Sequence, residues 1–494
     1  MIIPPNTTSA EHMEMFFNRI FVLFVFLSSV MLSKAQIVTV SEEYFPDPEF
    51  RRLLIDKHYD DHPEKIPTIT TLDLEYQWDP FYPPYDIKSL KGLEYFVSLR
   101  NLKLYNFRFE ENFDFSCFEY LSFLDYYSDI DTLDLSGLNV GTLVVQACCN
   151  HFVFPKSVNN SMDVMICGNN DFVDVVFPYY SKLKTLSIGA GNMKSLDLSN
   201  CPNLENLKIR SAYLENINIQ KNFKLRNLQF PGNFYSIRTL NISGNPNLEF
   251  LELINCPIES LNIKYNNKLQ RIDICNSNLK DWDIMNMPHL NTLRLMYNKQ
   301  LASLNIQNVP ELKELDCRAN SLEKVNLTNI PKLEIFYCCY NKLTSLDLSF
   351  PNLYRLHLHR NQIGEEAMTK LINDLPDKSG VSSSEGNSVI LDMHDSEEEG
   401  NFMITKELFD IAKSKNWYAG YAILGNNWQT FNYYLKNDLT YFVDSYRSWD
   451  FTDVGLGTVL KEPSVDNIYN INGQRIISPS QKGLYIRNGK KYVK

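Results

Sequence analysis

The chain has 494 residues, of which 44% are hydrophobic and 22% charged, so it has the composition of a folded protein and exceeds one compact core. Its formal net charge of −11 argues against nucleic acid as a ligand, because phosphate binding needs a cationic surface. Beyond its first 35 residues, no apolar stretch is long enough to span a bilayer, so we expect no transmembrane segment in the mature chain.

The N-terminus carries an apolar run, Ile20 to Leu27, which follows Arg19 and precedes Ser33 and Ala35. A short apolar run between a basic residue and small residues is typical of a secretory signal peptide. We therefore predict that residues 1–35 are cleaved and that the mature protein is secreted or reaches the outer cell surface. An uncleaved membrane anchor is the alternative.

Residues 36–92 come before the main repeat and are predicted to cap it. The stretch Phe45–Leu54 has the pattern of a short amphipathic helix, with Asp47 as its N-cap and Pro48 as its first helical residue. The acidic stretch from Asp56 to Lys65 lacks the ligand spacing and the glycine of a calcium loop, so we expect no calcium there.

A repeat of about 21 residues extends over residues 93–361, and each copy contains the motif L-x-x-L-x-L twice. In the first half of successive copies the motif begins at Leu269, Leu290, Leu312 and Leu333; in the second half it begins at Ile258, Leu301, Leu322 and Leu343. One copy cannot bury its own leucines, so neighbouring copies must stack around a shared core. Two extended segments per coil predict two narrow parallel sheets.

Each first half ends with a small or amide residue at its ninth position. Such a side chain fits where the chain bends, because it can turn inward and bond backbone groups. These residues are Gly191, Ala212, Asn233, Cys256, Ser277, Asn298, Asn320, Asn341 and Asn361. Between Tyr105 and Tyr180 the pattern weakens, and Phe152–Asn160 is interpreted as an insertion.

The period changes after Asn361, and residues 362–440 are predicted to form a mixed α/β cap at the end of the solenoid. We expect helices over 365–375 and 405–415, with strands over 388–393 and 417–424. Residues 441–494 are predicted to be a β-rich tail. Its two Asn-Gly pairs, at Asn472 and Asn488, each lie between strand-like runs, as in two-residue hairpins.

The repeat resembles the leucine-rich repeats of bacterial surface proteins, particularly the type found in Bacteroidetes and related to internalins. That resemblance implies an α/β leucine-rich-repeat solenoid: a β-rich, right-handed superhelix with two narrow parallel sheets, a helical N-cap and a mixed α/β C-cap. The last 30 residues are similar to C-terminal sorting signals of type nine secretion substrates, which implies export across the outer membrane. A small stabilising β-appendage is the alternative for this tail.

The two outward-facing rows differ in how much they vary from coil to coil. The outward residue of the second L-x-L is always Asn or Asp, which we interpret as a structural ladder bonding between coils: Asp197, Asn218, Asn241, Asn262, Asp283, Asn305, Asn326 and Asp347. The first-half row is varied and rich in Tyr and Arg, the side chains most enriched in binding hot spots. We therefore predict a ligand-binding face made of Arg271, Asp273, Arg294, Met296, Tyr297, Glu314, Asp316, Arg318, Tyr337, Tyr340, Arg355, His357, His359 and Arg360. A varied surface without a ligand is the alternative.

Ten cysteines in an exported chain would suggest disulfides. Cys317 and Cys338, however, replace inward leucines, and Cys201 and Cys256 fill turn positions, so we expect them to pack as small hydrophobes. A bridge between Cys317 and Cys338, one coil apart, is the alternative.

The sequence contains no metalloprotease, P-loop or nucleophile-elbow motif, so we predict no catalysis and no cofactor. His357 and His359 are expected to face outward beside Tyr337 and Cys339, a set that could hold zinc. Because paired surface histidines are more often only surface residues, we predict no metal there.

These patterns favour a secreted or cell-surface, adhesin-like binding protein that recognises a protein or glycan through its variable sheet. A structural or assembly protein of the bacterial envelope, without a dedicated ligand, is the main alternative. An enzyme with a site between residues 365 and 494 is a third hypothesis, which would need a pocket with paired titratable groups.

Overall fold

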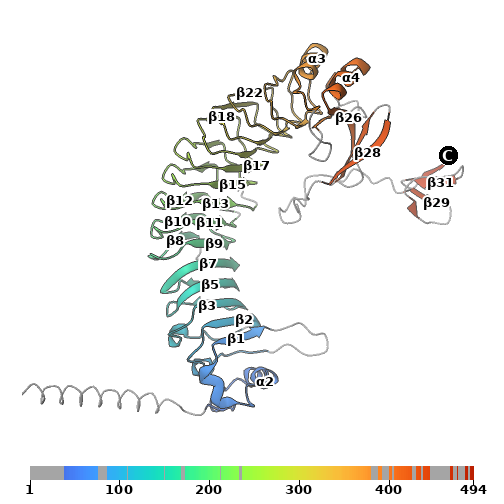
Figure 1. Cartoon of the computed structure of the whole chain (residues 1–494). Coiled ribbons are helices and arrows are strands. Elements are labelled where there is room, and N and C mark those ends of the chain that lie inside the picture. The colour runs from blue at the N-terminus through green and yellow to red at the C-terminus, as the bar shows by residue number, and fades with distance from the viewer. Residues whose placement is uncertain are drawn as a thin grey trace, which may run out of the picture. The chain divides into compact units, whose positions relative to one another are not determined.

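The computed structural model describes residues 38–75, 86–107, 109–149, 151–167, 173–211, 213–232, 236–379, 388–391, 400–402, 405–424, 430–435, 438–445, 468–470, 475–476, 484–487 and 490–493. The predicted signal peptide, residues 1–35, lies outside the described residues. The chain forms two compact units, Met1–Phe172 and Val173–Lys494. In each unit, parallel strands from successive coils stack on one another, so the chain is a leucine-rich-repeat solenoid (Figure 1).

The first unit begins with helix α2 (Pro48–Asp56), and the predicted N-cap is confirmed. One carboxylate oxygen of Asp47 accepts hydrogen bonds from the backbone N–H groups of Glu49 and Phe50, each at 2.9 Å. The other oxygen accepts from Lys88 N at 2.8 Å and Ser89 N at 3.0 Å. This buried carboxylate therefore caps the helix and also holds the segment that leads into the coils.

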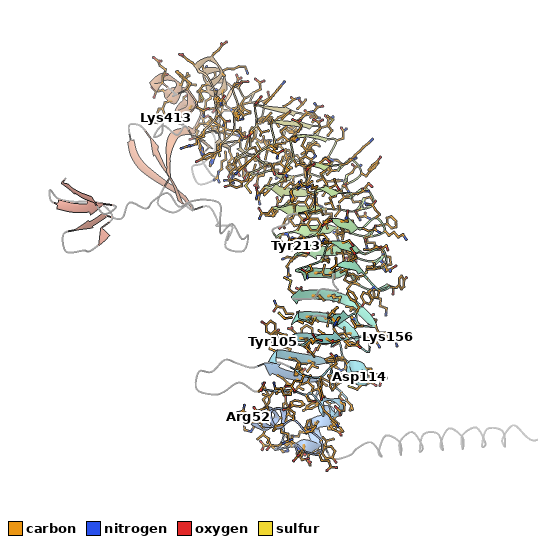
Figure 2. The ribbon with its side chains drawn as sticks, turned by 180° about the vertical axis from the view of Figure 1, so that it is seen from behind. Arg52, Tyr105, Asp114, Lys156, Tyr213 and Lys413 are labelled. Atoms are coloured by element: carbon orange, nitrogen blue, oxygen red, sulfur yellow. The ribbon has the colours of Figure 1, made fainter. Side chains whose placement is uncertain are left out.

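The sheet of the first unit contains β1 (Thr71–Glu75), β2 (Asn101–Phe107), β3 (Phe123–Asp129), β5 (Asn139–Cys148) and β7 (Ser157–Cys167). It begins inside the segment predicted as a cap, because β1 pairs in parallel with β2. A short 3-10 turn, η1 (Pro63–Thr68), lies between α2 and β1, and two more, η2 (Leu93–Tyr95) and η3 (Phe115–Cys117), lie between the strands. Outside the core, the ring of Tyr105, labelled in Figure 2, stacks on Tyr127 with centroids 6.5 Å apart.

The insertion predicted at Phe152–Asn160 is wrong, because this segment is part of the repeat. Strand β6 (His151–Val153) pairs in parallel with β4 (Thr132–Asp134), and β7 pairs with β5. The inward residues of β7 include Val158, Met162 and Val164, all buried. Valine and methionine fill the leucine positions here, which hides the motif from a search for leucine.

In the second unit, one parallel sheet joins the first halves of the coils. Register partners place Leu207 beside Leu228 and Ile272 beside Leu293, so equivalent residues of successive coils adjoin. The strands, in order, are β9 (Thr185–Ala190), β11 (Asn206–Ile209), β13 (Asn227–Phe230), β15 (Phe250–Ile254), β17 (Arg271–Cys275), β19 (Thr292–Arg294), β21 (Glu314–Asp316), β23 (Ile335–Tyr337) and β24 (Arg355–His357).

The second halves form shorter parallel sheets instead of one continuous sheet. In the described part of this unit they are β8 (Asp174–Val176) with β10 (Ser195–Asp197) and β12 (Asn216–Asn218); β14 (Thr239–Leu240) with β16 (Ser260–Leu261); and β18 (Asp281–Met285) with β20 (Ser303–Gln307) and β22 (Lys324–Thr328). Each pairing is parallel, as the repeat predicts.

The leucines of the motif form the shared core, as predicted: Leu290, Leu293 and Leu295 are fully buried. Cys317 and Cys338 occupy equivalent inward positions as buried free thiols, so the alternative of a bridge between them is not supported. Burial raises the pKa of both thiols well above the usual range, which keeps them protonated.

The amides predicted to turn inward at the ninth position do so at Asn298, Asn320, Asn341 and Asn361, while Asn233 lies outside the described residues. Asn341, for example, donates to the carbonyls of Cys317 and Cys338, each at 2.9 Å, and accepts from Leu322 N at 3.0 Å. A second row of buried amides, which was not predicted from the sequence, follows the second-half strands. Asn222, Asn245 and Asn266 each donate to two backbone carbonyls. These amides tie coil to coil where no strand pairing is available.

All four elements predicted after the repeat are confirmed: α3 (Glu365–Asp374), β25 (Ser388–Leu391), α4 (Lys406–Ser414) and β26 (Trp417–Leu424). Strand β26 continues into an antiparallel sheet with β27 (Thr430–Leu435) and β28 (Asp438–Ser445). In the tail, β29 (Ile468–Asn470) pairs antiparallel with β30 (Arg475–Ile476), and β31 (Leu484–Arg487) with β32 (Lys490–Val493). Arg487 pairs with Lys490, so two residues, Asn488 and Gly489, lie between these partners, as the hairpin prediction requires. Tyr469 pairs with Arg475, so five residues lie between these partners, and the two-residue turn predicted at Asn472-Gly473 is wrong.

Asn401 continues the inward amide row beyond the last coil. Its side chain donates to Leu358 O at 2.9 Å and accepts from Ile363 N at 3.0 Å, while Phe402 N donates to Ile363 O at 2.7 Å. The cap thus reproduces one rung of the repeat, so the backbone of the final coil finds the partners that a following coil would supply.

Candidate ligand-binding face

Strand register gathers eight of the fourteen predicted site residues into two columns on the outer side of the first-half sheet. We call this surface, from Arg271 to Arg360, the variable face. One column consists of Arg271, Thr292, Glu314, Ile335 and Arg355. The other consists of Asp273, Arg294, Asp316, Tyr337 and His357. Residues far apart in the sequence therefore adjoin here.

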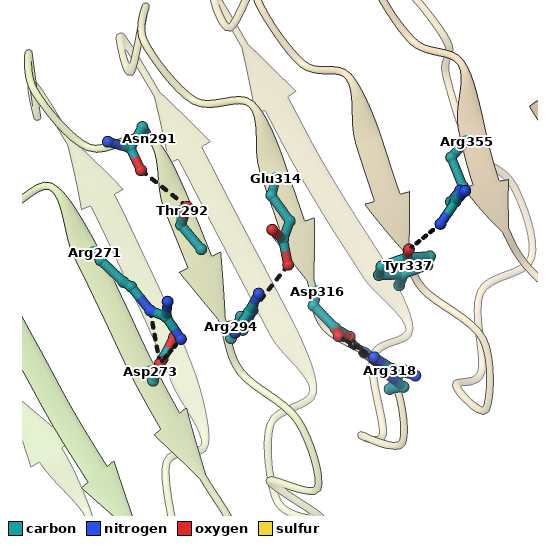
Figure 3. A network of polar contacts seen from close by, with 10 residues as sticks. All are labelled: Arg271, Asp273, Asn291, Thr292, Arg294, Glu314, Asp316, Arg318, Tyr337 and Arg355. Carbon is teal, nitrogen blue, oxygen red and sulfur yellow. Dashed lines mark hydrogen bonds and ion pairs between the residues drawn. The ribbon is translucent and has the colours of Figure 1, made fainter. Parts of the chain in front are cut away.

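Three arginines of the variable face form ion pairs within it (Figure 3). Arg271 contacts Asp273 at 2.6 Å, and Arg318 contacts Asp316 at 2.5 Å, each within one coil. The third arginine, Arg294, reaches Glu314 of the next coil at 2.8 Å. Because ion pairs hold these guanidinium groups in place, the arginine side chains would lose less conformational entropy if a ligand bound them.

Aromatic rings hold the guanidinium groups at the end of the variable face. The Arg318 guanidinium lies 5.0 Å from the centre of the Tyr337 ring, and Arg360 lies 5.4 Å from that of Tyr340. Arg355 Nη1 is 3.4 Å from the Tyr337 hydroxyl (Figure 3). Tyr337 also packs edge-on against the His357 ring, with centroids 4.7 Å apart. Such cation–π contacts fix the direction in which the arginines point.

The exposure of this face is less uniform than the strand alternation predicts. Asp273, Asp316, Tyr337, His357 and His359 point away from the leucine core but are buried. The expectation that both histidines face solvent is therefore wrong. Strands of neighbouring coils lie close together, so the long Arg and Tyr side chains of one coil cover shorter ones of the next.

The accessible part of the variable face consists of its longer side chains. Tyr297 is 43% exposed, the Arg271 side chain 33%, and the Arg318 side chain 23%. Met296, Glu314, Tyr340, Arg355 and Arg360 are half-buried. A partner would meet tyrosine and arginine first, with the acids beneath them.

The backbone is left-handed at the eighth position of each of the last six coils. Asn255 and Asn276 hold this position in the earlier coils, and the Asn276 amide donates to Asn255 Oδ1 at 2.8 Å. The following four coils place Tyr297, Ala319, Tyr340 and Arg360 there, with φ between 53° and 60°. Asparagine tolerates this conformation far better than tyrosine or arginine does.

Burial changes the titration of several groups on the face. Burial, with the positive charges of Arg360 and Arg318, lowers the pKa of His359 to about 3. The pKa of His357 is also lowered, by burial and then by its neighbours His359, Arg318 and Arg355. Both imidazoles are therefore neutral at neutral pH. Burial raises the pKa of Asp273, against the opposing effect of Arg271.

The second-half row forms the predicted bonds between coils and has a second role as well. Bonds between coils occur, from Asn218 to Asp197 and from Asn326 to Asn305, each at 3.0 Å. In four coils, however, the side chain also accepts from the backbone N–H two residues later, which closes a turn. These bonds join Asp197 to Ser199, Asn218 to Gln220, Asn241 to Ser243 and Asn262 to Lys264. Asn and Asp side chains make this turn-closing bond most strongly, and Ser and Thr make it more weakly.

Two residues that were not predicted as part of the site, Phe250 and Glu252, extend the variable face toward the N-terminus. The Arg271 guanidinium lies 5.5 Å from the centre of the Phe250 ring, on β15. Beside it, Glu252 accepts a hydrogen bond from Gln229 at 2.9 Å, and burial raises the pKa of Glu252. Phe250 and Glu252 lie at strand positions that point to the same side of the sheet as Arg271. This strand alternation could have identified them from the sequence.

The zinc set considered from the sequence is not assembled. Among the residues that the structure describes, no three His, Cys, Asp or Glu side chains are placed to hold a metal ion. The rings of His357 and His359 have their centroids 6.5 Å apart. Much of the region proposed for an alternative enzyme site, residues 365–494, lies outside the described residues.

No family model matches the sequence, and no curated protein matches it. Among solved structures, the chain is similar to the functional domain of InlJ from Listeria monocytogenes, at 18% identity and a TM-score of 0.48, covering 68% of this chain and 79% of that one. It is similar to the internalin InlF of Listeria monocytogenes at 15% identity and a TM-score of 0.41, covering 72% and 98%. A leucine-rich-repeat protein of Leptospira interrogans follows at 15% identity and a TM-score of 0.36, covering 58% and 91%.

Structural similarity at 15–18% sequence identity does not indicate a ligand, so the proposed function depends on the residues of this chain. No helix among the described residues is both long and apolar enough to cross a membrane.

Proposed function

We propose that this chain is a secreted or cell-surface binding protein, adhesin-like, that recognises a protein or glycan ligand through the variable face. The observation that carries the proposal is the left-handed eighth position. The fold places Asn255 and Asn276 there, and Tyr297, Tyr340 and Arg360 hold the equivalent positions of later coils.

A left-handed backbone costs most L-residues about 1–2 kcal/mol, whereas asparagine adopts it routinely. Tyrosine and arginine at these positions therefore work against folding stability. Strained residues of this kind cluster at functional sites, where the side chain is needed for another reason. The solenoid requires neither a phenol nor a guanidinium there, so recognition by those side chains is the reason that we propose.

The composition of the face agrees with this role. Tyr and Arg dominate binding hot spots, because they bury large areas and still make directed polar contacts. Here their geometry is fixed by ion pairs and ring contacts such as Arg318 with Asp316 and Tyr337. A surface arranged before binding loses less conformational entropy when the ligand arrives.

The test replaces the two strained tyrosines, Tyr297 and Tyr340, by asparagine, which favours the left-handed conformation. The Tyr297→Asn, Tyr340→Asn double variant keeps the left-handed position comfortable and removes both phenols. Capture of ligand from host-cell and envelope extracts should fall sharply, with an unchanged circular dichroism spectrum. The matched control is Tyr213→Asn, Tyr265→Asn, which alters tyrosines 51% and 55% exposed outside the variable face.

Equal capture by the double variant and the wild type would refute the proposal and favour an envelope-assembly role without a dedicated ligand. Equal loss in the control variant would refute the assignment to this face. Tyr337 is unsuitable for the test, because it is buried and its removal would disturb packing.

A further inference from the structure

Four rings pack together on the outer side of the last two coils of the variable face. Tyr337 packs edge-on against His357, with centroids 4.7 Å apart, and Tyr340 packs edge-on against His359, with centroids 5.1 Å apart. The centroids of the two imidazole rings lie 6.5 Å apart. We call Tyr337, Tyr340, His357 and His359 the histidine–tyrosine cluster. Its two histidines are only 4% and 1% exposed, so the cluster is closed to water.

We propose that the histidine–tyrosine cluster is a pH-sensitive switch, in which protonation of its two histidines opens the last two coils of the variable face. The inference goes beyond the proposed function, because it concerns the conformation of the face with no ligand present. The opening would displace Tyr340 and its neighbour Arg360, which both belong to the variable face.

His359 gives the geometric evidence for the switch. Neither of its ring nitrogens has a hydrogen-bond partner among the described residues. A neutral imidazole has one N–H donor, whereas a protonated imidazole has two donors and carries a charge. Burying an unpaired charge costs far more than burying an unpaired polar group. A protonated His359 must therefore reach water, and Tyr340 has to move for this to happen.

The charges that act on the two histidines oppose a further positive charge. Burial first, and then the positive charges of Arg360 and Arg318, lower the pKa of His359 to about 3. Burial also lowers the pKa of His357, followed by the effects of His359, Arg318 and Arg355. The closed cluster therefore favours neutral imidazoles, and the open one does not.

The charged and titratable groups around the cluster come from three neighbouring coils. They are Arg355 and Arg360 in the coil of the histidines, Cys339 in the coil of the tyrosines, and Arg318 with its ion-pair partner Asp316 in the coil before. Strand β25 also packs against β24, and its residues, Ser388–Leu391, are not titratable. An acid that could stabilise a protonated imidazole is thus held by Arg318, with an N–O distance of 2.5 Å.

The repeat itself does not require imidazoles at these two positions. The preceding three coils hold Met296, Arg318 and Cys339 at the position of His359, and Arg294, Asp316 and Tyr337 at that of His357. The two histidines are therefore specific to the end of the face. Because coils of a repeat array can open locally, proton uptake there need not unfold the rest of the solenoid.

The test is amide hydrogen exchange of the full-length protein at pH 7 and pH 5, with each rate compared with that of an unstructured chain at the same pH. Cys338 N donates to His357 O at 2.8 Å and Tyr340 N donates to His359 O at 2.9 Å, so both amides report opening of the cluster. One histidine that regains its ordinary pKa of 6.5 on opening shifts the equilibrium about 25-fold between these pH values. Protection of both amides should fall by at least about that factor.

Protection of the Asn255 amide, which donates to Cys275 O at 2.9 Å in an earlier coil, should change much less. The His357→Phe, His359→Phe variant keeps two aromatic rings and removes both titrating groups, so its Cys338 and Tyr340 amides should lose less than about threefold protection. The matched control is His289→Phe, which alters an exposed histidine of the same unit and should behave as the wild type does.

Equal protection of the Cys338 and Tyr340 amides at both pH values would overturn the proposal. An equal fall at Asn255 would also overturn it, because acid would then be opening the solenoid as a whole. A fall that persists unchanged in the phenylalanine variant would assign the effect to other groups and overturn the role of the histidines. If that variant does not fold, His359→Gln, which is neutral at both pH values, replaces it and should lose less protection than the wild type.

Discussion

Asn341→Ala should destabilise the last coils by roughly 2–4 kcal/mol, because several buried backbone groups would lose their partners at once. The Asn341 amide donates to the carbonyls of Cys317 and Cys338, and its oxygen accepts from Leu322 N at 3.0 Å. Each such bond contributes about 0.5–1.5 kcal/mol, and an orphaned buried group costs about 1–3 kcal/mol. No water can reach the site easily, since Asn341 and Leu322 are both buried.

The measurement is amide hydrogen exchange at Leu322, combined with urea unfolding followed by circular dichroism. Hydrogen exchange reports local opening, which matters because long repeat arrays need not unfold in one cooperative step. Asn352→Ala is the matched control: Asn352 is exposed and makes one bond between coils, to Pro331 O at 3.0 Å. Its expected effect is below about 0.5 kcal/mol. A loss of less than about 1 kcal/mol in Asn341→Ala, or equal losses in both variants, would refute the reasoning.

Three further variants test other parts of the structure. Ala319→Asn should raise the free energy of unfolding by about 1 kcal/mol, because asparagine relieves the strain of a φ of 56°; an unchanged urea midpoint would contradict this. The folded-state pKa of His359 is about 3 against an ordinary 6.5, so its contribution to stability is present above pH 6.5 and is lost as the pH falls toward 3. This loss should be about 2 kcal/mol at pH 5, and thermal melts at pH 7 and pH 5 should show the pH dependence reduced by about that amount in His359→Phe; the part that remains comes from His357, whose pKa is also lowered. Asp47→Ala should expose the Phe50 amide to exchange, with Asp114→Ala, which removes an exposed cap, as the control.

Most of the fold could be predicted from the repeat, because the spacing of leucines and the alternation of side chains along a strand can be read from a short stretch of sequence. Leu293 and Leu295 point inward since they are two residues apart on a strand, and Asp47 caps α2 since it immediately precedes Pro48. These inferences need no knowledge of neighbouring coils. Where leucine gave way to Val158 and Met162, the same parity held, but the pattern could not be recognised.

Exposure on the variable face could not be read from the sequence in the same way. Parity correctly puts Tyr337 and His357 outside the leucine core, yet both are buried, because side chains from the same and neighbouring coils pack over them. Exposure of an outward residue depends on the length and rotamer of several neighbours, which strand alternation does not contain. The role of Asn401 could not be predicted for a related reason. It depends on two backbone groups of the last coil, Leu358 O and Ile363 N, which are distant in the sequence.

The second-half row and the first-half columns differ in how strongly the backbone restricts which side chains they can hold. In four coils of the second-half row the side chain closes its own turn, as Asn241 does by accepting from Ser243 N at 3.1 Å, so a residue without a side-chain acceptor would leave a backbone donor without a partner. In the first-half columns the backbone is satisfied by strand pairing, as Arg294 shows in its register with Asp316. One of these side chains, Asp316, also accepts from the backbone N–H of Arg318 at 3.2 Å. Strand pairing itself does not depend on the side chains, so their identity can vary more widely than in the second-half row. Specificity for a ligand would therefore accumulate on the variable face, while the second-half row stays the same from coil to coil.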